Sequence, residues 1–472
     1  MQDLSKLTRE ELQNYSKDQL IDVILFLLKR DEENQKQIQL LKQEVEELKR
    51  QLNLRNKNSS NSSKPPSGDN KPNNNANDKP TGKKPGGQKG HAGSAREHVD
   101  NPDEIIQCAP STCLSCGNSL AGIDGTLKAA RQLIEVPPIK AHVTEYQQFE
   151  ITCPCGCTNV GSFPESIKAP VQFGDNLKSM IIYLNIFHHL PYDRLTKIFK
   201  DLLGVSFSEG SIANILNIAQ VRAEPYCSQI RELLLKSKWV GSDETWIRVK
   251  NENWFLWVWQ NILFSYFVSH KRRAYEVVKE YFGEIFKGTL IHDCFGSQNK
   301  TEALNHQHCH LHYLRPLEFC KDYEKESYKW ALEVSVFFMQ SWEAQRVIWE
   351  EGFSKENREK IIDSFELRLN ELTKVPLTTK EAIKIQNRLK KHRDKILTFM
   401  RDPDIPYHNN GSERAIRKAK IHKKVSGCFR SENGAQRFAK ILSVIETARK
   451  HGTDTIEAIK KMLTGNLVFQ GT

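Results

Sequence analysis

Two aspartates interrupt apolar runs of this chain, where an unpaired carboxylate is costly. Asp243 lies within the aromatic and β-branched run 239–249, and Asp293 closes the short apolar run 288–293. A divalent cation shared between them would remove that cost, since Mg²⁺ takes oxygen ligands of this kind. For either residue alone, a solvated face or a turn is the more ordinary explanation. Together they predict a metal site, provided that the fold brings them to one place.

The segments around these aspartates predict how they meet. Runs rich in aromatic and β-branched residues predict three antiparallel strands, which a helical pattern and a further apolar strand follow. The expected bounds are strands at 239–249, 254–260 and 263–270, a helix at 273–286 and a strand at 288–293. In an RNase H-like sheet the first and fourth of these strands are neighbours. Asp243 and Asp293 would then line one pocket, although 50 positions separate them.

A third candidate acid, Glu413, stands in a strongly basic stretch. Residues 413–440 contain nine lysines and arginines against two acids. Ser412 is expected to cap a helix that begins at Glu413, where the helix dipole favours a carboxylate. The acid is either paired with Arg417 or a third metal ligand inside a phosphate-binding surface. The candidate phosphate-binding residues beside it are Arg414, Arg417 and Lys418.

The cysteines predict a zinc site. Cys113 and Cys116 form a C-x-x-C pair, and Cys153-Pro-Cys155-Gly-Cys157 follows about forty residues later, after a strand-like stretch at 140–152. Two such knuckles fit tetrahedral thiolate zinc, which stabilises a module too small for a large core. The expected ligands are Cys113, Cys116, Cys153 and Cys155, with Cys157 as the alternative to Cys155. The 11 cysteines, an odd number, also fit a reducing compartment better than a disulfide framework.

A cysteine and a histidine form another candidate pair of ligands after Asp293. Cys309 and His312 form a C-x-x-H pair at a predicted strand-to-helix junction, and Arg315 follows. The pair can either bind a metal or act as a polar brace beside the acids. Half of a zinc site is a third interpretation, and it lacks an obvious second half.

Residues 171–235 are expected to be helical, with a helix-turn-helix pattern. A helix at 192–203 ends at Gly204, and Ser208 can cap a second helix at 209–221. A short turn of this kind is the geometry that sets a helix into the major groove, although any two packed helices share the pattern. The inward residues would be Ile212, Ile215, Leu216 and Ile218. The outward residues, candidates for DNA contact, would be Ser211, Asn214 and Asn217.

The N-terminal hundred residues are predicted to form a helix followed by a linker. In residues 1–54, apolar residues recur at alternating spacings of three and four, a heptad seam that predicts a coiled coil between copies of the chain. The alternative is a solvated helix packed on its own protein. The seam consists of Ile24, Leu27, Ile38, Leu41, Val45, Leu48 and Leu52. Residues 55–100 have almost no apolar side chains and are expected to be disordered. Their lysines, among them Lys83, Lys84 and Lys89, either follow phosphates or belong to a solvated tether.

The composition narrows the class of partner. The formal net charge of +11 favours an anionic partner, nucleic acid first. The longest apolar run, at 20–28, is interrupted by Asp22 and is too short to span a membrane. No secretory signal is visible at the N-terminus. These features predict a cytoplasmic protein.

Several motifs together resemble the bacterial transposases of insertion-sequence family sixty-six, the TnpC-type proteins. The motifs are SDETW, HDCF, HCHLHYLR and YHNNGSERAIRKAKIHKKVSGCFRSENGAQRFAKILSVIETARKHG. The resemblance covers nearly the whole chain, including the linker. It implies a multidomain α+β protein, a DDE transposase with an RNase H-like catalytic domain and an all-α insertion before the last acid. Asp243, Asp293 and Glu413 would be its catalytic triad, and Cys309 and His312 would match the family's C-x-x-H motif.

The resemblance and the residue patterns together predict an order of domains. These are a coiled coil (1–54), a basic linker (55–100), a zinc-binding module (101–170), a helix-turn-helix domain (171–235), the first part of the catalytic domain (236–318), the insertion (319–402), the second part of the catalytic domain (403–452) and a C-terminal tail (453–472).

The expected activity is binding of transposon ends, metal-dependent cleavage and joining of the 3′ ends to double-stranded target DNA. Two Mg²⁺ or Mn²⁺ ions would activate the attacking oxygen and stabilise the leaving one. A homodimer or larger assembly, a location at the bacterial nucleoid and help from accessory proteins of the same element are also expected. The alternatives are a catalytically silent DNA-binding protein and an RNase H-like nuclease that never joins strands.

Overall fold

The computed structural model describes residues 16–58, 61 and 98–470. The chain divides into two compact units. The first unit contains residues up to 71, residues 223–454 and the last five residues, and the second contains residues 72–222 and 455–467.

The first unit is built on a five-stranded mixed sheet with the strand order β5-β4-β3-β6-β7. Its strands are β3 (Trp239–Val249), β4 (Glu252–Gln260), β5 (Ser265–His270), β6 (Ile285–His292) and β7 (Glu302–His308). β3, β4 and β5 pair antiparallel, whereas β6 pairs with β3, and β7 with β6, in parallel. The predicted order of three antiparallel strands, a helix and a parallel strand beside the first is confirmed.

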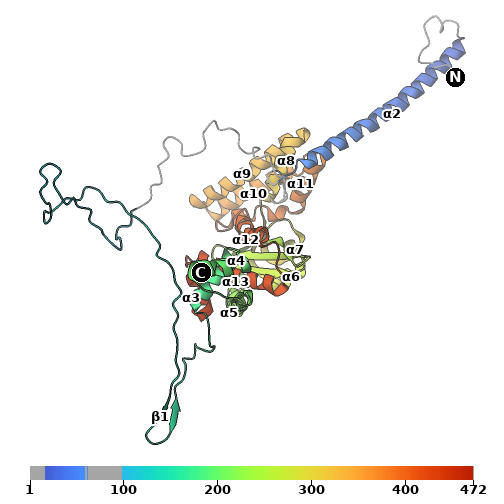
Figure 1. Ribbon diagram of the computed structural model, residues 1–472. Helices are drawn as coiled ribbons and strands as arrows, with labels where there is room; N and C mark the ends of the chain where they lie inside the picture. Colours follow the sequence, from blue (N-terminus) through green and yellow to red (C-terminus); the bar gives the residue numbers. More distant parts are fainter. Residues whose placement is uncertain (1–15, 59–60, 62–97, 471–472) are drawn as a thin grey trace. The chain divides into compact units, whose positions relative to one another are not determined.

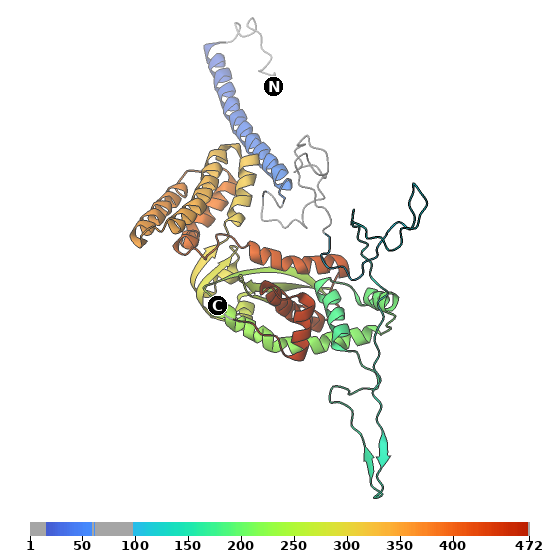
Figure 2. The same ribbon diagram turned by 90° about the vertical axis from the view of Figure 1, so that its left-hand side faces the viewer.

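Short helices connect the strands, and two longer ones pack on the sheet. α6 (Tyr275–Tyr281) joins β5 to β6, and α7 (Gly296–Asn299) joins β6 to β7. α12 (Asn410–Ser426) runs alongside β3 and β4, and α13 (Glu432–Lys450) packs on β5 (Figure 2). α6 is shorter than the predicted helix at 273–286, because β6 already begins at Ile285.

Helix α13 also protects the edge of the sheet. β5 is an edge strand, and an edge presents N–H groups without a partner strand. The backbone N–H of Phe267 donates to Ser443 Oγ at 2.8 Å, and that of Ser265 donates to Thr447 Oγ1 at 3.0 Å. Two hydroxyls one helical turn apart therefore satisfy two donors of the edge.

An all-helical layer follows β7. It comprises α8 (Leu311–Tyr323), η4 (Lys325–Ser327), α9 (Tyr328–Glu350), α10 (Lys355–Leu372), α11 (Lys380–Lys391), η5 (Arg393–Lys395) and η6 (Thr398–Arg401). Phe337, Phe338 and Leu389 are fully buried in its core. The same core includes Ile291 of β6 and Tyr313 of α8, so the layer is packed on the sheet and not merely tethered to it.

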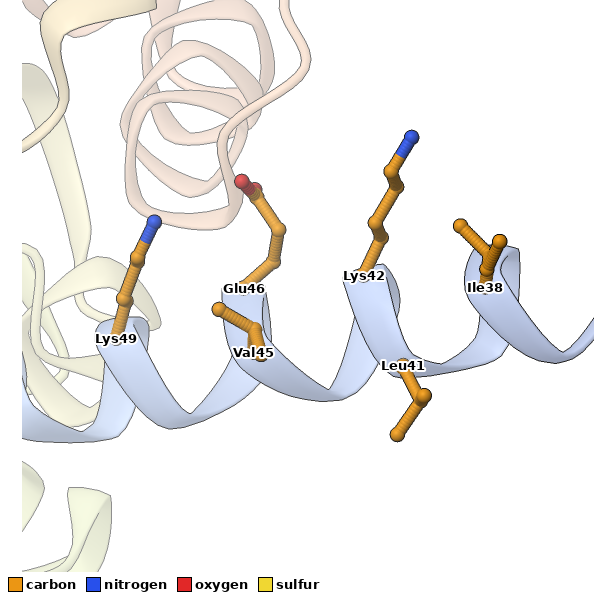
Figure 3. A pocket seen from close by; sticks show the side chains of 6 residues that line it. All are labelled: Ile38, Leu41, Lys42, Val45, Glu46 and Lys49. Carbon is orange, nitrogen blue, oxygen red and sulfur yellow. The ribbon is translucent and has the colours of Figure 1, made fainter.

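The N-terminal helix is α2 (Lys17–Arg55), blue in Figure 1, and the apolar residues of its heptad seam are exposed. A shallow hollow on its surface is lined by Ile38, Leu41, Lys42, Val45, Glu46 and Lys49 (Figure 3). Near its C-terminal end it contacts the helical layer, where Lys380 pairs with Glu47 at 2.9 Å. Just beyond the helix, Lys57 pairs with Glu381 at 2.7 Å.

The second unit combines a small hairpin with helices. Its elements are β1 (Glu150–Thr152), β2 (Thr158–Val160), α3 (Asp175–Ile182), the π-helix η3 (Tyr183–Phe187), α4 (Tyr192–Leu203), the first part of α5 (Glu209–Leu235) and α14 (Thr455–Thr464). Gly204 ends α4 in the left-handed conformation at φ 68°, and Ser208 Oγ accepts the N–H of Ser211 at 3.1 Å. Both were predicted from the sequence.

The structure corrects several predicted bounds. α5 continues from residue 221 to Leu235, because a second apolar face takes over there and includes Ala223, Cys227, Ile230 and Leu234, all buried. Ile218, predicted to point inward, is 50 % exposed. Only the last three residues of the strand-like stretch at 140–152 form a strand. α12 begins at Asn410, so Ser412 lies inside the helix and does not cap it.

No helix in the described ranges is long and apolar enough to cross a lipid bilayer.

Candidate active site

Asp243 lies on β3, and Asp293 directly follows the neighbouring strand β6 at the same level of the sheet. β3 and β6 pair in parallel from Trp239 with Thr289 to Gly241 with Ile291, a constant offset of 50 positions. The same offset joins Asp243 to Asp293, which directly follows β6. The two carboxylates, predicted to meet from the order of the strands, therefore come together at the point where β6 ends, and the charge of Asp293 acts on Asp243.

Asp243 is half-buried, and its surroundings disfavour its charge. Burial raises the pKa of its carboxyl well above the ordinary value, and the charges of Glu244, Asp293 and Glu413 raise it further. The N–H of Glu244 donates to Asp243 Oδ1 at 2.8 Å and acts in the opposite direction. Asp243, Asp293 and Glu413 therefore form a site in which negative charge accumulates.

Glu244 anchors the loop that carries Asp293. Its side chain is 2 % exposed and accepts from Arg273 Nε at 2.7 Å and from Gln298 Nε2 at 2.5 Å. The guanidinium carbon of Arg273 also lies over the Phe295 ring, 3.6 Å from its centre. The N–H of Phe295 in turn donates to Asp293 Oδ1 at 2.8 Å. Successive residues of a strand point to opposite faces, so Glu244 holds the loop from the face opposite to Asp243.

Glu413 lies in the first turn of α12, which is docked closely on β3. Asn409, directly before the helix, donates from Nδ2 to the carbonyl of Ser242 at 2.7 Å. Gly241 permits the approach, since a Cβ there would lie 2.6 Å from Asn409 Oδ1 and 2.7 Å from Ser412 Oγ. The contact places Glu413 beside the strand of Asp243.

The C-x-x-H pair and Arg315 surround Glu413. Arg315 Nη2 lies 3.2 Å from Glu413 Oε2, and His312 Nε2 lies 3.8 Å from Oε1. Cys309 is fully buried and accepts the N–H of Asn409 at 3.2 Å. Cys309, His312 and Glu413 offer ligand atoms within 4.8 Å of one another, the one such cluster of three among the described residues. Asp293 and Glu413 both act on the pKa of His312, which burial lowers.

Of the predicted phosphate-binding residues, Arg414 and Arg417 are exposed on α12. Lys418 is half-buried, 3.7 Å from Glu446. The alternative partner of Glu413, Arg417, is not the one found, because Arg315 occupies that place. Lys83, Lys84 and Lys89 lie outside the described residues.

The two cysteine knuckles form separate tight turns. Gly117 and Gly156 take positive φ angles of 75° and 87°, and their N–H groups donate to the carbonyls of Cys113 and Cys153. N–H groups of Cys116 and Ser115 lower the pKa of Cys113, and that of Cys157 lowers the pKa of Cys155, as suits thiolate ligands. Within the described residues, Cys113, Cys116, Cys153, Cys155 and Cys157 form no cluster of three within 4.8 Å.

In the helix-turn-helix segment, Asn214 and Asn217 are exposed on α5. Ser211 is half-buried, and its hydroxyl lies 3.1 Å from that of Ser208. Two of the three predicted outward residues are therefore exposed, whereas Ser211 belongs to the start of the helix.

Sequence reasoning missed Glu244, Asn409 and Gly241 as supports of the site. An acid next to Asp243 in an apolar strand was a visible signal of a buried carboxylate, but its partners lie 29 and 54 positions away. The close approach at Gly241 depends on a contact with residues more than 160 positions later, as the contact between Asn409 and Ser242 shows.

Comparison with known proteins places these elements in a family. Residues 170–437, more than half of the chain, match the Transposase IS66 family. Residues 3–97 match a family of unknown function, DUF6444. The chain is also similar to Uncharacterized protein y4hP of Sinorhizobium fredii, with 24 % identity over 393 residues, which cover 75 % of this chain and 70 % of the relative.

Proposed function

The chain belongs to the IS66 transposase family, whose members process DNA, and from this premise we propose that it is a DDE transposase with an RNase H-like catalytic domain. The observation that carries the proposal is the meeting of three acids. Asp243 in β3 is level with Asp293, which follows the adjacent parallel strand β6, and α12 sets Glu413 beside β3.

The three acids suit divalent cations. All offer oxygen, the donor that Mg²⁺ and Mn²⁺ prefer. Glu413 Oε1 is buried without a hydrogen-bond partner, and the carboxylates raise the pKa of Asp243, so bound positive charge would stabilise the site. Asp243, Asp293 and Glu413 together would hold the two ions. When bound, the ions would lower the pKa of the attacking water or 3′-hydroxyl and stabilise charge on the leaving oxygen.

The remaining groups would orient DNA. Arg414 and Arg417 project from α12 next to Glu413 and would hold the phosphate backbone, with Lys418 nearby. No Ser or Tyr nucleophile is required, because each strand is cut and joined by direct displacement at phosphorus. Glu244 and Arg273 would keep the Asp293 loop in place while the substrate changes.

The second unit would recognise the ends. Its α4 and α5 have the turn and cap of a helix-turn-helix, and Asn214 and Asn217 face outward from α5. We assign structural zinc to Cys113, Cys116 and Cys153, with Cys155 or Cys157 as the fourth ligand. Binding requires the two knuckles to approach each other, which metal binding itself would drive.

Helix α2 would join two copies of the chain. Its seam residues are between 42 and 62 % exposed although they are apolar, and their heptad spacing fits a second copy of the same helix. Pairing of two chains suits a reaction that brings two transposon ends together. The work on DNA would take place at the bacterial nucleoid, with accessory proteins of the same element as further candidate partners.

The direct test is cleavage of DNA that carries the ends of the chain's own element, in Mg²⁺ or Mn²⁺, with the wild type beside Glu413→Gln. We expect cleavage by the wild type alone and equal end binding by both. Full cleavage by Glu413→Gln would refute the triad.

Strand transfer needs its own measurement. Pre-cleaved ends with free 3′-hydroxyls are incubated with a plasmid, and joined products are expected. Cleavage without joining, also when the element's other proteins are added, would identify a nuclease instead of a transposase. End binding with neither reaction under the same conditions would identify a silent DNA-binding protein.

A further inference from the structure

Cys309, His312 and Glu413 come together from three elements. Cys309 follows β7, His312 lies in the first turn of α8, and Glu413 lies in the first turn of α12. Their ligand atoms are within 4.8 Å of one another, and His312 Nε2 is 3.8 Å from Glu413 Oε1. Bonds of about 2.0–2.3 Å to a tetrahedral ion would place neighbouring ligand atoms roughly 3.3–3.8 Å apart. Shifts of about an ångström would therefore close the cluster around one ion.

The cluster contains a polar atom that needs a partner. Glu413 Oε1 is buried and makes no hydrogen bond, because His312 Nε2 is beyond hydrogen-bond distance. The other oxygen, Oε2, is held by Arg315 at 3.2 Å. A buried polar atom without a partner is costly, and a cation would remove that cost. The side chains of His312 and Glu413 keep 16 and 19 % of their surface exposed, which leaves access from solvent.

The donor set selects the class of ion. A thiol, an imidazole and a carboxylate match Zn²⁺ and similar thiophilic cations, whereas Mg²⁺ prefers oxygen alone. Three protein ligands also leave the fourth position of a tetrahedral site open.

We propose that Cys309, His312 and Glu413 bind Zn²⁺, or another thiophilic divalent cation, in a site that excludes catalytic Mg²⁺ from Glu413. The binding part stands on the cluster alone, and the exclusion rests on the proposed function of Glu413. Since Arg315 holds Oε2, both ions would need Oε1. Zinc at this site would therefore inhibit cleavage by withdrawing one of the three acids.

The binding test uses the full chain without DNA. After equilibration with Zn²⁺ in the presence of Mg²⁺, the zinc content per chain is measured for the wild type, His312→Gln and Cys309→Ser. Each variant is expected to hold one zinc fewer than the wild type, whatever the cysteine knuckles bind. With Co²⁺ as the probe, Cys309→Ser should lose part of the sulfur-to-cobalt absorption.

Matched controls separate this site from general effects. His188→Gln replaces an exposed histidine, and Cys428→Ser replaces a half-buried cysteine that follows α12. Both should keep the wild-type zinc content. Circular dichroism checks folding, and His312→Gln decides the outcome if the buried Cys309 does not tolerate serine. Unchanged zinc content in folded His312→Gln would overturn the proposal.

The inhibition test adds Zn²⁺ to Mg²⁺-dependent cleavage. Half-inhibition of His312→Gln should need at least about tenfold more zinc than that of the wild type, because loss of a direct ligand should weaken binding at least as much as loss of an outer-shell partner, which costs roughly 10–100-fold in metal affinity. If zinc inhibits the wild type and His312→Gln equally although the variant holds one zinc fewer, the proposed exclusion of Mg²⁺ from Glu413 is refuted. The zinc site itself would still stand. Absence of cleavage by the wild type would count against the proposed function and leave the binding result standing.

Discussion

The surroundings of Asp243 destabilise its charged form, which indicates a site arranged to bind a cation at a cost to the stability of the metal-free protein. A carboxylate in an apolar strand, beside three other acids, has a pKa raised above its ordinary value of 3.8. The folded state therefore holds the proton more tightly than the unfolded state. Stability falls as the pH rises above the ordinary pKa, and the full penalty is present above the folded pKa.

Replacing Asp243 by Asn should stabilise the metal-free protein. The amide has the same size and no charge, so the penalty at neutral pH disappears. We expect the Tm of Asp243→Asn in EDTA to exceed that of the wild type by about 2–4 °C, the shift that 1 kcal/mol gives in a domain of roughly 150–250 residues. The difference should shrink as the pH is lowered toward 4, which thermal scans at several pH values would measure.

Two comparisons test whether the charge of Asp243 causes this difference in Tm. The exposed Asp124→Asn should leave Tm unchanged at every pH. Mg²⁺ should raise the Tm of the wild type, because it binds the folded site, and should have a smaller effect on Asp243→Asn. A variant no more stable than the wild type in EDTA would mean that the carboxylate is not under electrostatic strain.

Glu244 illustrates a residue whose role depends on distant partners. Loss of its carboxylate releases Arg273 and Gln298 and with them the loop of Asp293. We expect Glu244→Ala to reduce the rate of cleavage about 10²-fold, the cost of an ångström-scale misplacement, and to raise the Mg²⁺ concentration needed. Binding of end DNA should be unchanged, as a gel-shift titration would measure.

Two further variants test the positioning role of Glu244. Arg273→Gln, at a partly exposed position, should act in the same direction without removing the buried acid. Glu252→Ala removes an exposed acid of β4, paired with Lys271, and should be neutral. A normal Mg²⁺ requirement in both Glu244→Ala and Arg273→Gln would exclude a positioning role.

Among the elements, those with strong local patterns were predictable. The alternation and β-branching of 239–249 predict β3 to the residue, and the turn at Gly204 and Ser208 fixes the start of α5. The C-terminal half of α5 was missed, because its apolar face changes after residue 221. The start of α12 was misplaced, since the side chain of Asn409, directly before the helix, binds the carbonyl of Ser242 in β3 instead of capping the helix. Such long-range contacts leave no local pattern in the sequence.

The docking of α12 on β3 depends on the absence of a side chain at Gly241. A Cβ there would collide with Asn409 and Ser412, and Asn409 is buried and bound to Ser242, so it has little freedom to move. We expect Gly241→Ala to lower the free energy of unfolding by about 1–3 kcal/mol, the usual cost of overpacking. Cleavage should fall about 10²-fold, because Glu413 moves with the helix.

Urea denaturation and a cleavage assay would measure both effects of Gly241→Ala. Gly125→Ala is the matched control, since a Cβ at that exposed glycine meets nothing within 4 Å. Full activity in a destabilised Gly241→Ala protein would show that the contact supports the fold without setting the position of Glu413.

At the scale of the whole molecule, the apolar seam of α2 stands out because it is exposed in a single chain. Apolar side chains at heptad spacing face solvent along the helix, while its ion pairs with the helical layer of its own chain, among the described residues, lie at or just beyond its C-terminal end. A contiguous apolar stripe of this kind marks an interaction site. A second α2 would cover it without disturbing the contacts at Glu47 and Lys57.

Charges placed in the seam should therefore separate the copies. The double variant Leu41→Lys and Leu48→Lys puts two like charges at the centre of the expected interface, so light scattering should show a monomer where the wild type is a dimer or larger. The matched control, Gln39→Lys and Gln43→Lys, adds two charges at exposed positions outside the seam and should keep the wild-type mass. Deletion of residues 1–54 should also give a monomer. If both double variants keep the wild-type mass, the seam is not the contact between copies, and another surface must join them.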